Sequence, residues 1–195
     1  MKALILGGAR SGKSQYAEQQ ALSQAHLSQD KTCVYLATGT AGDKEMAARI
    51  DHHQRRRGSQ WLLVEEPINL AQALHNIDSE DNIIVIDCLT LWLSNCLLAS
   101  EQNNNHDSSE KSINTHVITQ QKEAFLDILP SLRSDVFIVS NEVGSGVVPL
   151  GKLSRDFVDH SGWLHQALAK LCDTVTLVVA GLPLVLKNQE LNKAE

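Results

Sequence analysis

Residues Gly7–Ser14 read G-G-A-R-S-G-K-S, which matches the phosphate-binding loop pattern G-x-x-x-x-G-K-S. The apolar run Ala3–Leu6 precedes this stretch and a helix-forming run, Gln15–His26, follows it. Glycines let successive backbone N–H groups converge on phosphate oxygens at the start of a helix. A chance glycine-rich turn is the alternative, but it would not require a strand before it and a helix after it. The sequence therefore predicts a nucleotide-phosphate site here.

Two side chains of this loop and one distant carboxylate predict how a nucleotide and Mg²⁺ would be held. Lys13 supplies a charge for the β- and γ-phosphates, and the Ser14 hydroxyl is a ligand for Mg²⁺. Asp87 ends the unbroken apolar run Ile83–Ile86, as expected of a Walker B aspartate that completes the metal shell. A cap on the helix that starts near Thr90 is the alternative role for Asp87.

Apolar runs and helical patterns alternate along the 195 residues. The predicted strands are residues 3–6, 32–38, 61–65, 82–87, 135–140 and 174–180, with a short edge strand at 184–186. The predicted helices are residues 15–26, 43–57, 69–77, 89–98, 115–129 and 153–172, the last with Trp163, Leu164 and Leu168 as its core stripe. Such alternation predicts one α/β domain, residues 1–195, with three layers and a mostly parallel central sheet, the P-loop NTPase fold of RecA-like type.

Composition limits where the protein acts and what it binds. No apolar run reaches the length of a membrane span and no signal peptide is evident, so we expect a cytoplasmic protein. The net charge of −6 argues against nucleic acid as a partner. The four cysteines are scattered, which predicts buried free thiols. Residues 100–114 are expected to form a polar surface loop, and residues 188–195 a frayed tail.

The predicted helix at residues 43–57 places two adjacent histidines on different sides of the helix. At 100° per residue His53 shares a stripe with Met46 and Ile50, while His52 points away. An inward histidine is either a core residue or a reactive one. The triple-arginine run at 55–57 is either a solvated face or a binding site for a triphosphate tail, and its charge would keep the imidazole neutral and nucleophilic.

Two further loops follow predicted strands, at the edge where parallel sheets bind ligands. Thr38, Gly39 and Thr40 form one of them and serve either as ligand contacts or as an ordinary turn. The glycine-containing segment 141–149 is the other, and we interpret it as a lid or substrate loop in preference to a plain crossover.

Four sequence blocks resemble the bifunctional adenosylcobinamide kinase and adenosylcobinamide-phosphate guanylyltransferase family of cobalamin biosynthesis. They are Gly7–Ser14, Glu45–His53 (E-M-A-A-R-I-D-H-H), Ser140–Pro149 (S-N-E-V-G-S-G-V-V-P) and Arg155–Gln166 (R-D-F-V-D-H-S-G-W-L-H-Q). The resemblance covers nearly the whole chain. Members of the family often have Asn at the position of His165 and Glu at that of Asp87, so the roles of these two positions stay open.

The resemblance implies two reactions. ATP or GTP phosphorylates the aminopropanol hydroxyl of adenosylcobinamide, and GMP is then transferred from GTP to that phosphate by way of His53, which carries GMP covalently. Mg²⁺ assists, and the family forms homotrimers. Together with the loop pattern, the resemblance predicts nucleotide contacts at Gly7, Gly8, Ala9, Arg10, Ser11, Gly12, Lys13, Ser14, Thr38, Gly39, Thr40, Gln54, Arg55, Arg56, Arg57, Glu65 and Asp87.

Two other functions fit the same loop. One is a kinase of another small metabolite without a covalent histidine, which would retain no GMP. The other is a RecA-type nucleotide-dependent ATPase, which would be stimulated by polynucleotides and which the negative charge disfavours.

Overall fold

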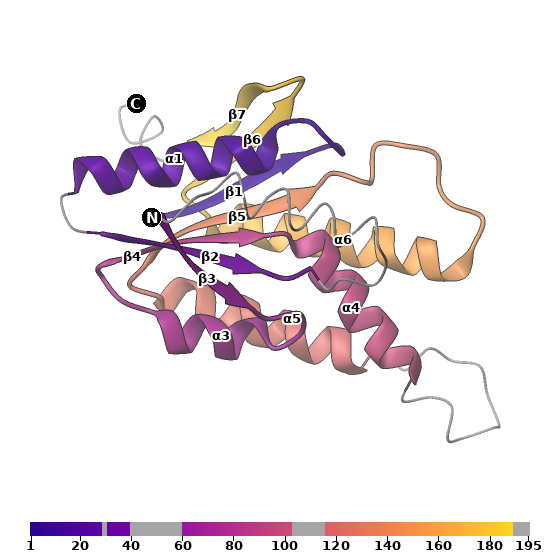
Figure 1. The fold of residues 1–195 in the computed structure, drawn as a ribbon. Helices are drawn as coiled ribbons and strands as arrows, with labels where there is room; N and C mark the ends of the chain where they lie inside the picture. Colours follow the sequence, from indigo (N-terminus) through magenta and orange to yellow (C-terminus); the bar gives the residue numbers. More distant parts are fainter. Residues whose placement is uncertain (29–30, 40–59, 103–115, 189–195) are drawn as a thin grey trace.

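The fold is known from a computed structural model, which describes residues 1–28, 31–39, 60–102 and 116–188. Seven strands form one sheet in the order β3-β2-β4-β5-β1-β6-β7 (Figure 1). They are β1 (Lys2–Gly7), β2 (Thr32–Ala37), β3 (Trp61–Glu65), β4 (Asn82–Asp87), β5 (Asp135–Asn141), β6 (Thr174–Val179) and β7 (Leu182–Asn188). All neighbours are parallel except β6 and β7, which confirms the predicted mostly parallel sheet.

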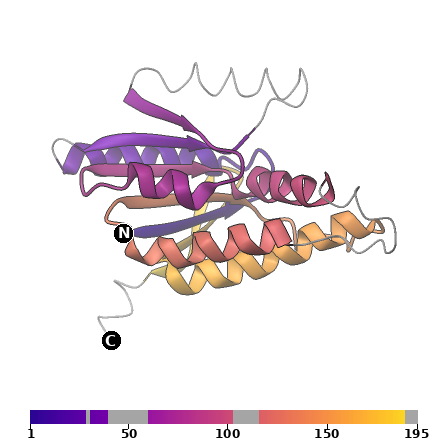
Figure 2. The same cartoon turned by 90° about the horizontal axis from the view of Figure 1, so that it is seen from below.

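Helices cover both faces of the sheet, as the alternation of patterns predicts. They are α1 (Lys13–Leu27), α3 (Leu70–Ile77), α4 (Leu89–Gln102), α5 (His116–Ile128) and α6 (Lys152–Leu171), with a short 3₁₀ helix at Leu129–Ser131. Helix α1 packs on one face through the small residues Ala17 and Ala21, and α3, α4, α5 and α6 build a larger core on the other (Figures 1 and 2). The three-layer prediction is therefore confirmed; the helix expected at residues 43–57 lies outside the described residues.

The central strands are buried on both faces, which explains their unbroken apolar sequences. In β4, Ile84 and Ile86 belong to the larger core, whereas Ile83 and Val85 face α1. Burying such a side chain stabilises the fold by about 1.5–3 kcal/mol. All four cysteines are buried free thiols, as predicted.

Several predicted boundaries are wrong. Helix α4 runs to Gln102, so the segment expected to be a loop from residue 100 is still helical there. Strand β7 spans Leu182–Asn188, longer than the predicted edge strand, and includes the first residue of the expected tail. The remaining residues of that loop and tail lie outside the described ranges.

The predicted core stripe of α6 is wrong at Trp163, whose residue surface is 59% exposed. Its ring packs edge-on against His160, with 5.5 Å between ring centroids, and lies under the Lys122 ammonium. The buried positions of α6 are Ser161, Leu164, His165 and Leu168. Because they recur at intervals of three and four residues, this stripe leaves Trp163 one residue outside the core.

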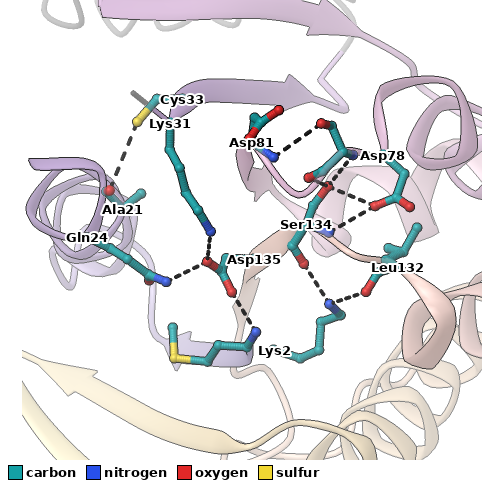
Figure 3. Close-up of polar contacts among 12 residues, drawn as sticks. Lys2, Ala21, Gln24, Lys31, Cys33, Asp78, Asp81, Leu132, Ser134 and Asp135 are labelled. Atoms are coloured by element: carbon teal, nitrogen blue, oxygen red, sulfur yellow. Dashed lines mark hydrogen bonds and ion pairs between the residues drawn. The ribbon is translucent and has the colours of Figure 1, made fainter. Parts of the chain in front are cut away.

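A polar network lies at the amino ends of the strands, opposite the edge that carries the phosphate loop (Figure 3). One Asp78 carboxylate oxygen accepts hydrogen bonds from the backbone N–H of Arg133 and Ser134, each at 2.9 Å, and from the Ser134 hydroxyl at 2.8 Å. Burial raises the pKa of Asp78, but these hydrogen bonds outweigh it and leave the pKa below its ordinary value.

Replacing Asp78 with Ala is expected to lower the free energy of unfolding at neutral pH by about 2 kcal/mol, because hydrogen bonds to a charged group are lost. The depressed pKa means that Asp78 stabilises the fold above the unfolded value of about 3.9, and that this contribution disappears as the pH falls through the folded value. The difference between wild type and variant should therefore shrink in acid, as measured by thermal unfolding between about pH 7 and pH 3. Glu80→Ala, at an exposed side chain, is the control and should change little. A constant difference at every pH would contradict the prediction.

Candidate nucleotide-binding site

The predicted phosphate loop connects the interior strand β1 to helix α1. Its backbone turns sharply: Arg10 and Gly12 have φ of 56° and 94°. The Ser11 N–H donates to the Gly8 carbonyl oxygen at 3.2 Å, and Gly12 is the N-cap residue of α1. The loop thus brings backbone N–H groups to the amino end of a helix, where an anion is stabilised.

The hairpin of β6 and β7 supports this loop. The sequence patterns predicted the loop but not this support. Its turn consists of Ala180 and Gly181, with φ of 52° and 80°. The Gly181 N–H donates to the Ser11 carbonyl oxygen at 2.8 Å. A Cβ added to Gly12 would lie 3.2 Å from the Gly181 Cα, so the absence of a side chain at Gly12 allows the close approach. A Cβ added to Gly181 would meet no atom within 4 Å, and it is the positive φ that favours glycine there. Gly181 between two apolar runs is the signal in the sequence for such a turn, whereas Ala180 has a positive φ that residues with a Cβ rarely adopt.

Lys13 is buried, with 8% of its residue surface exposed, and its Nζ donates to the Gly8 carbonyl oxygen at 3.1 Å. Burial lowers the pKa of the Lys13 ammonium, and nearby groups that include the Asp87 carboxylate oppose the shift. The cation is therefore folded back over the loop, beside the position expected for phosphate. Ser14 follows in the first turn of α1 and is half-buried.

Asp87 ends β4, separated from β1 by the single strand β5. The Tyr35 hydroxyl donates to Asp87 Oδ2 at 2.5 Å. The Thr38 hydroxyl accepts from the Cys88 N–H at 3.0 Å and donates to the Cys88 carbonyl oxygen at 2.7 Å. The buried Thr38 side chain thus fixes the backbone that carries Asp87, and its contact with nucleotide stays a prediction.

The other predicted site residues are distributed unevenly. Glu65 is exposed at the end of β3, with three strands between it and β1, whereas Gly39 is half-buried just beyond the end of β2. The structure therefore brings Lys13, Ser14 and the loop together, places Asp87 two strands away, and puts Glu65 at the far side of the sheet. His53, Thr40, Gln54, Arg55, Arg56 and Arg57 lie outside the described residues.

Sequence reasoning left the role of His165 open, and the structure gives it specific contacts. The ring is buried on α6, with Nε2 2.8 Å from the Ser140 hydroxyl oxygen and Nδ1 3.9 Å from a Glu142 carboxylate oxygen. Burial lowers the pKa of His165, and the Glu142 carboxylate opposes this. The spacing of the buried positions in α6 is the sequence feature that could have indicated that His165 is buried.

A phosphate loop after an interior strand of a mostly parallel sheet, with helices on both faces, defines a P-loop nucleotide-binding protein. The fold is similar to that of a solved ATPase domain, with a TM-score of 0.52 and 14% identity over 97% of this chain and 77% of that chain. A family model described as cobinamide kinase / cobinamide phosphate guanyltransferase matches residues 3–186. The chain belongs to this family.

Curated relatives match nearly the whole length of the chain. The chain is 44% identical to the bifunctional adenosylcobalamin biosynthesis protein CobP of Pseudomonas aeruginosa over 98% of this chain and 100% of the relative. It is 32% identical to the bifunctional adenosylcobalamin biosynthesis protein CobU of Escherichia coli and 33% identical to that of Salmonella typhimurium, each over 96% of this chain and 100% of the relative. The resemblance seen in the four blocks is therefore confirmed. Over the described residues, no helix is both long and apolar enough to cross a membrane.

Proposed function

We propose that this protein phosphorylates the aminopropanol hydroxyl of adenosylcobinamide with ATP or GTP and then transfers GMP from GTP to the new phosphate, giving adenosylcobinamide-GDP. The observation that carries the proposal is the folded phosphate loop with its buried Lys13, in a chain that the family model matches from residue 3 to residue 186. We also propose that the protein is a homotrimer, as the family resemblance implies, and that it acts in the cytoplasm, as expected from its composition.

The first reaction needs alignment and charge neutralisation more than covalent help from the protein. The backbone N–H groups of the loop and the start of α1 orient the triphosphate, and Lys13 stabilises the negative charge that develops on the transferred phosphoryl group. The hydroxyl oxygen then displaces a nucleoside diphosphate.

The protein residues fit Mg²⁺. The described residues contain no group of three or more His, Cys, Asp or Glu that could hold a metal by itself. Mg²⁺ in phosphoryl-transfer enzymes usually has one or two protein ligands and completes its shell with phosphates and water, and a hydroxyl and a carboxylate are the oxygen donors it prefers. Ser14 and Asp87 would hold it, and when bound it neutralises phosphate charge.

The second reaction requires a nucleophile, for which we propose His53. A neutral imidazole attacks the α-phosphorus of GTP, pyrophosphate leaves, and the resulting phosphoramidate passes GMP to the phosphate of the cobinamide substrate. The arginines at 55–57 would keep the ring neutral and bind the triphosphate. Thr40, Gln54, Glu65 and Asp87 are the further nucleotide contacts that we propose.

GTP labelled on the α-phosphate is expected to leave acid-labile, alkali-stable label on the wild-type protein and none on His53→Ala. The neighbouring His52→Ala, one residue away and on another side of the predicted helix, is the control and should keep the label. Cobinamide phosphorylation by His53→Ala should persist, because that step needs no imidazole. Absence of label from the wild type would favour a kinase without a covalent histidine.

A further inference from the structure

Glu142 lies where the sheet meets the phosphate loop. It directly follows β5, the strand between β1 and β4. Its backbone N–H donates to the Gly7 carbonyl oxygen at 3.0 Å and so extends the pairing of β5 with β1 by one residue. Strand β5 lies between β4, which ends on Asp87, and β1, and Glu142 lies three residues beyond Val139, the register partner of Asp87. A carboxylate on this strand end is well placed to reach a group that reacts at the terminal phosphate.

Several groups fix the direction of the Glu142 side chain. One carboxylate oxygen accepts from the Gly144 N–H at 2.6 Å and from the Ser145 hydroxyl at 3.3 Å. The other lies 3.9 Å from Nδ1 of the buried His165, whose Nε2 is 2.8 Å from the Ser140 hydroxyl oxygen. The Glu142 side chain stays 30% exposed. It is therefore oriented from within the protein and still accessible to a substrate.

Burying the His165 imidazole costs solvation free energy, which suggests that this side chain has a role beyond folding. His165 occupies a buried position of α6 between Leu164 and Leu168, where an apolar side chain would pack without loss of solvation. A turn at residues 142–145 could also form with a shorter capping side chain, which would not reach toward the helix. The imidazole is held by the Ser140 hydroxyl and lies 3.9 Å from the Glu142 carboxylate, where it can restrict the position of that carboxylate.

Among the described residues, the other carboxylates at this edge of the sheet have another role in the proposal, cap a turn, or lie farther from the loop. The Asp87 carboxylate accepts the Tyr35 hydroxyl, and one Glu66 oxygen accepts the backbone N–H groups of Ile68 and Asn69. Glu65 lies at the end of β3, with three strands between it and β1. Among these acids, Glu142 follows β5, the strand paired with β1 beside the loop, and its carboxylate is both oriented and accessible.

We propose that Glu142 is the general base of the phosphorylation step, an inference that rests on the proposed function. The substrate hydroxyl oxygen forms a bond to the terminal phosphorus of the nucleoside triphosphate, and its proton moves to the Glu142 carboxylate. The bond from that phosphorus to the bridging oxygen breaks, and its electron pair leaves with the nucleoside diphosphate. His165 acts as a positioning residue for this carboxylate. GMP transfer to a substrate that is already phosphorylated involves no hydroxyl proton and does not need Glu142.

Glu142→Gln separates the two reactions because the amide keeps the size of the side chain and still accepts from Gly144, yet is not a base. Cobinamide phosphorylation should fall by about 10²- to 10⁴-fold, the usual contribution of general acid–base catalysis. Covalent labelling from α-phosphate-labelled GTP and GMP transfer to cobinamide phosphate should stay within about twofold of wild type, a change that corresponds to under 0.5 kcal/mol. Glu142→Asp, which keeps a carboxylate, should recover part of the phosphorylation rate.

The matched control is Glu66→Gln. The Glu66 carboxylate also accepts backbone N–H groups at this edge, but it lies in the turn that precedes α3. It should leave phosphorylation unchanged. Equal loss of both reactions in Glu142→Gln, or no loss of either, would overturn the assignment and leave Glu142 as a support of the turn. Wild-type protein that labels with GMP but does not phosphorylate cobinamide would instead count against the proposed function.

Discussion

Lys13→Met is expected to abolish both cobinamide phosphorylation and covalent GMP labelling, with a loss in kcat/KM of about 10³-fold or more for each reaction. The reason is that both reactions start from a triphosphate in the same loop. The Lys13 ammonium is buried over that loop, where low polarity strengthens its attraction to phosphate. Steady-state kinetics and the labelling assay measure the two losses, and nucleotide titration measures the accompanying fall in affinity.

The same substitution should leave the thermal stability of the nucleotide-free protein unchanged or raise it. Burial lowers the pKa of Lys13, which means that the folded state disfavours its charged form. The resulting penalty is present at every pH below the folded pKa, so removing the ammonium removes it.

Lys31→Met is the matched control for Lys13→Met. The Lys31 ammonium pairs with Asp135 at 2.8 Å in the polar network at the opposite ends of the strands (Figure 3). This variant should therefore lose stability and keep activity, the reverse of Lys13→Met. Wild-type activity in Lys13→Met, or a Lys13→Met protein that is inactive only because it unfolds, would contradict the role given to Lys13.

The fold was largely predictable because its signals are local. The unbroken apolar sequence of β4 marks a strand buried on both faces, and the loop motif requires β1 before it and α1 after it. The sheet order is not local. The sequence near Asn141 does not indicate that β5 lies between β1 and β4, yet this position of β5 places Glu142 beside the loop.

The parts of the site that escaped prediction depend on contacts between distant segments. The hydrogen bond from the Gly181 N–H to the Ser11 carbonyl oxygen joins residues that are 170 positions apart in the sequence. The contacts of His165 depend on how α6 packs against β5, which also leaves Trp163 exposed where its apolar character predicted burial. Periodicity identifies a buried stripe, but the elements that pack against α6 decide which of two adjacent stripes is buried.

Gly7→Ala is expected to disable the site through packing alone. A Cβ at Gly7 would lie 2.5 Å from the backbone carbonyl oxygen of Val178 and 2.5 Å from the Ser11 hydroxyl oxygen. Gly7 and Val178 are register partners in the parallel pairing of β1 with β6, so the carbonyl cannot move without opening the sheet. Overpacking of this kind costs about 1–3 kcal/mol. The variant should show a lower melting temperature and lose both reactions, because the displaced strand end carries the loop.

Gly8→Ala is the matched control for Gly7→Ala. A Cβ at Gly8 would meet no other atom within 4 Å, although Gly8 is the next residue of the same loop. Its melting temperature should therefore stay close to that of the wild type, and the difference between the two variants, measured by thermal unfolding without nucleotide, isolates the contact with β6. If both variants melted together with the wild type, β1 and β6 would have to separate freely at this point, and the hairpin would not be what holds the phosphate loop in place.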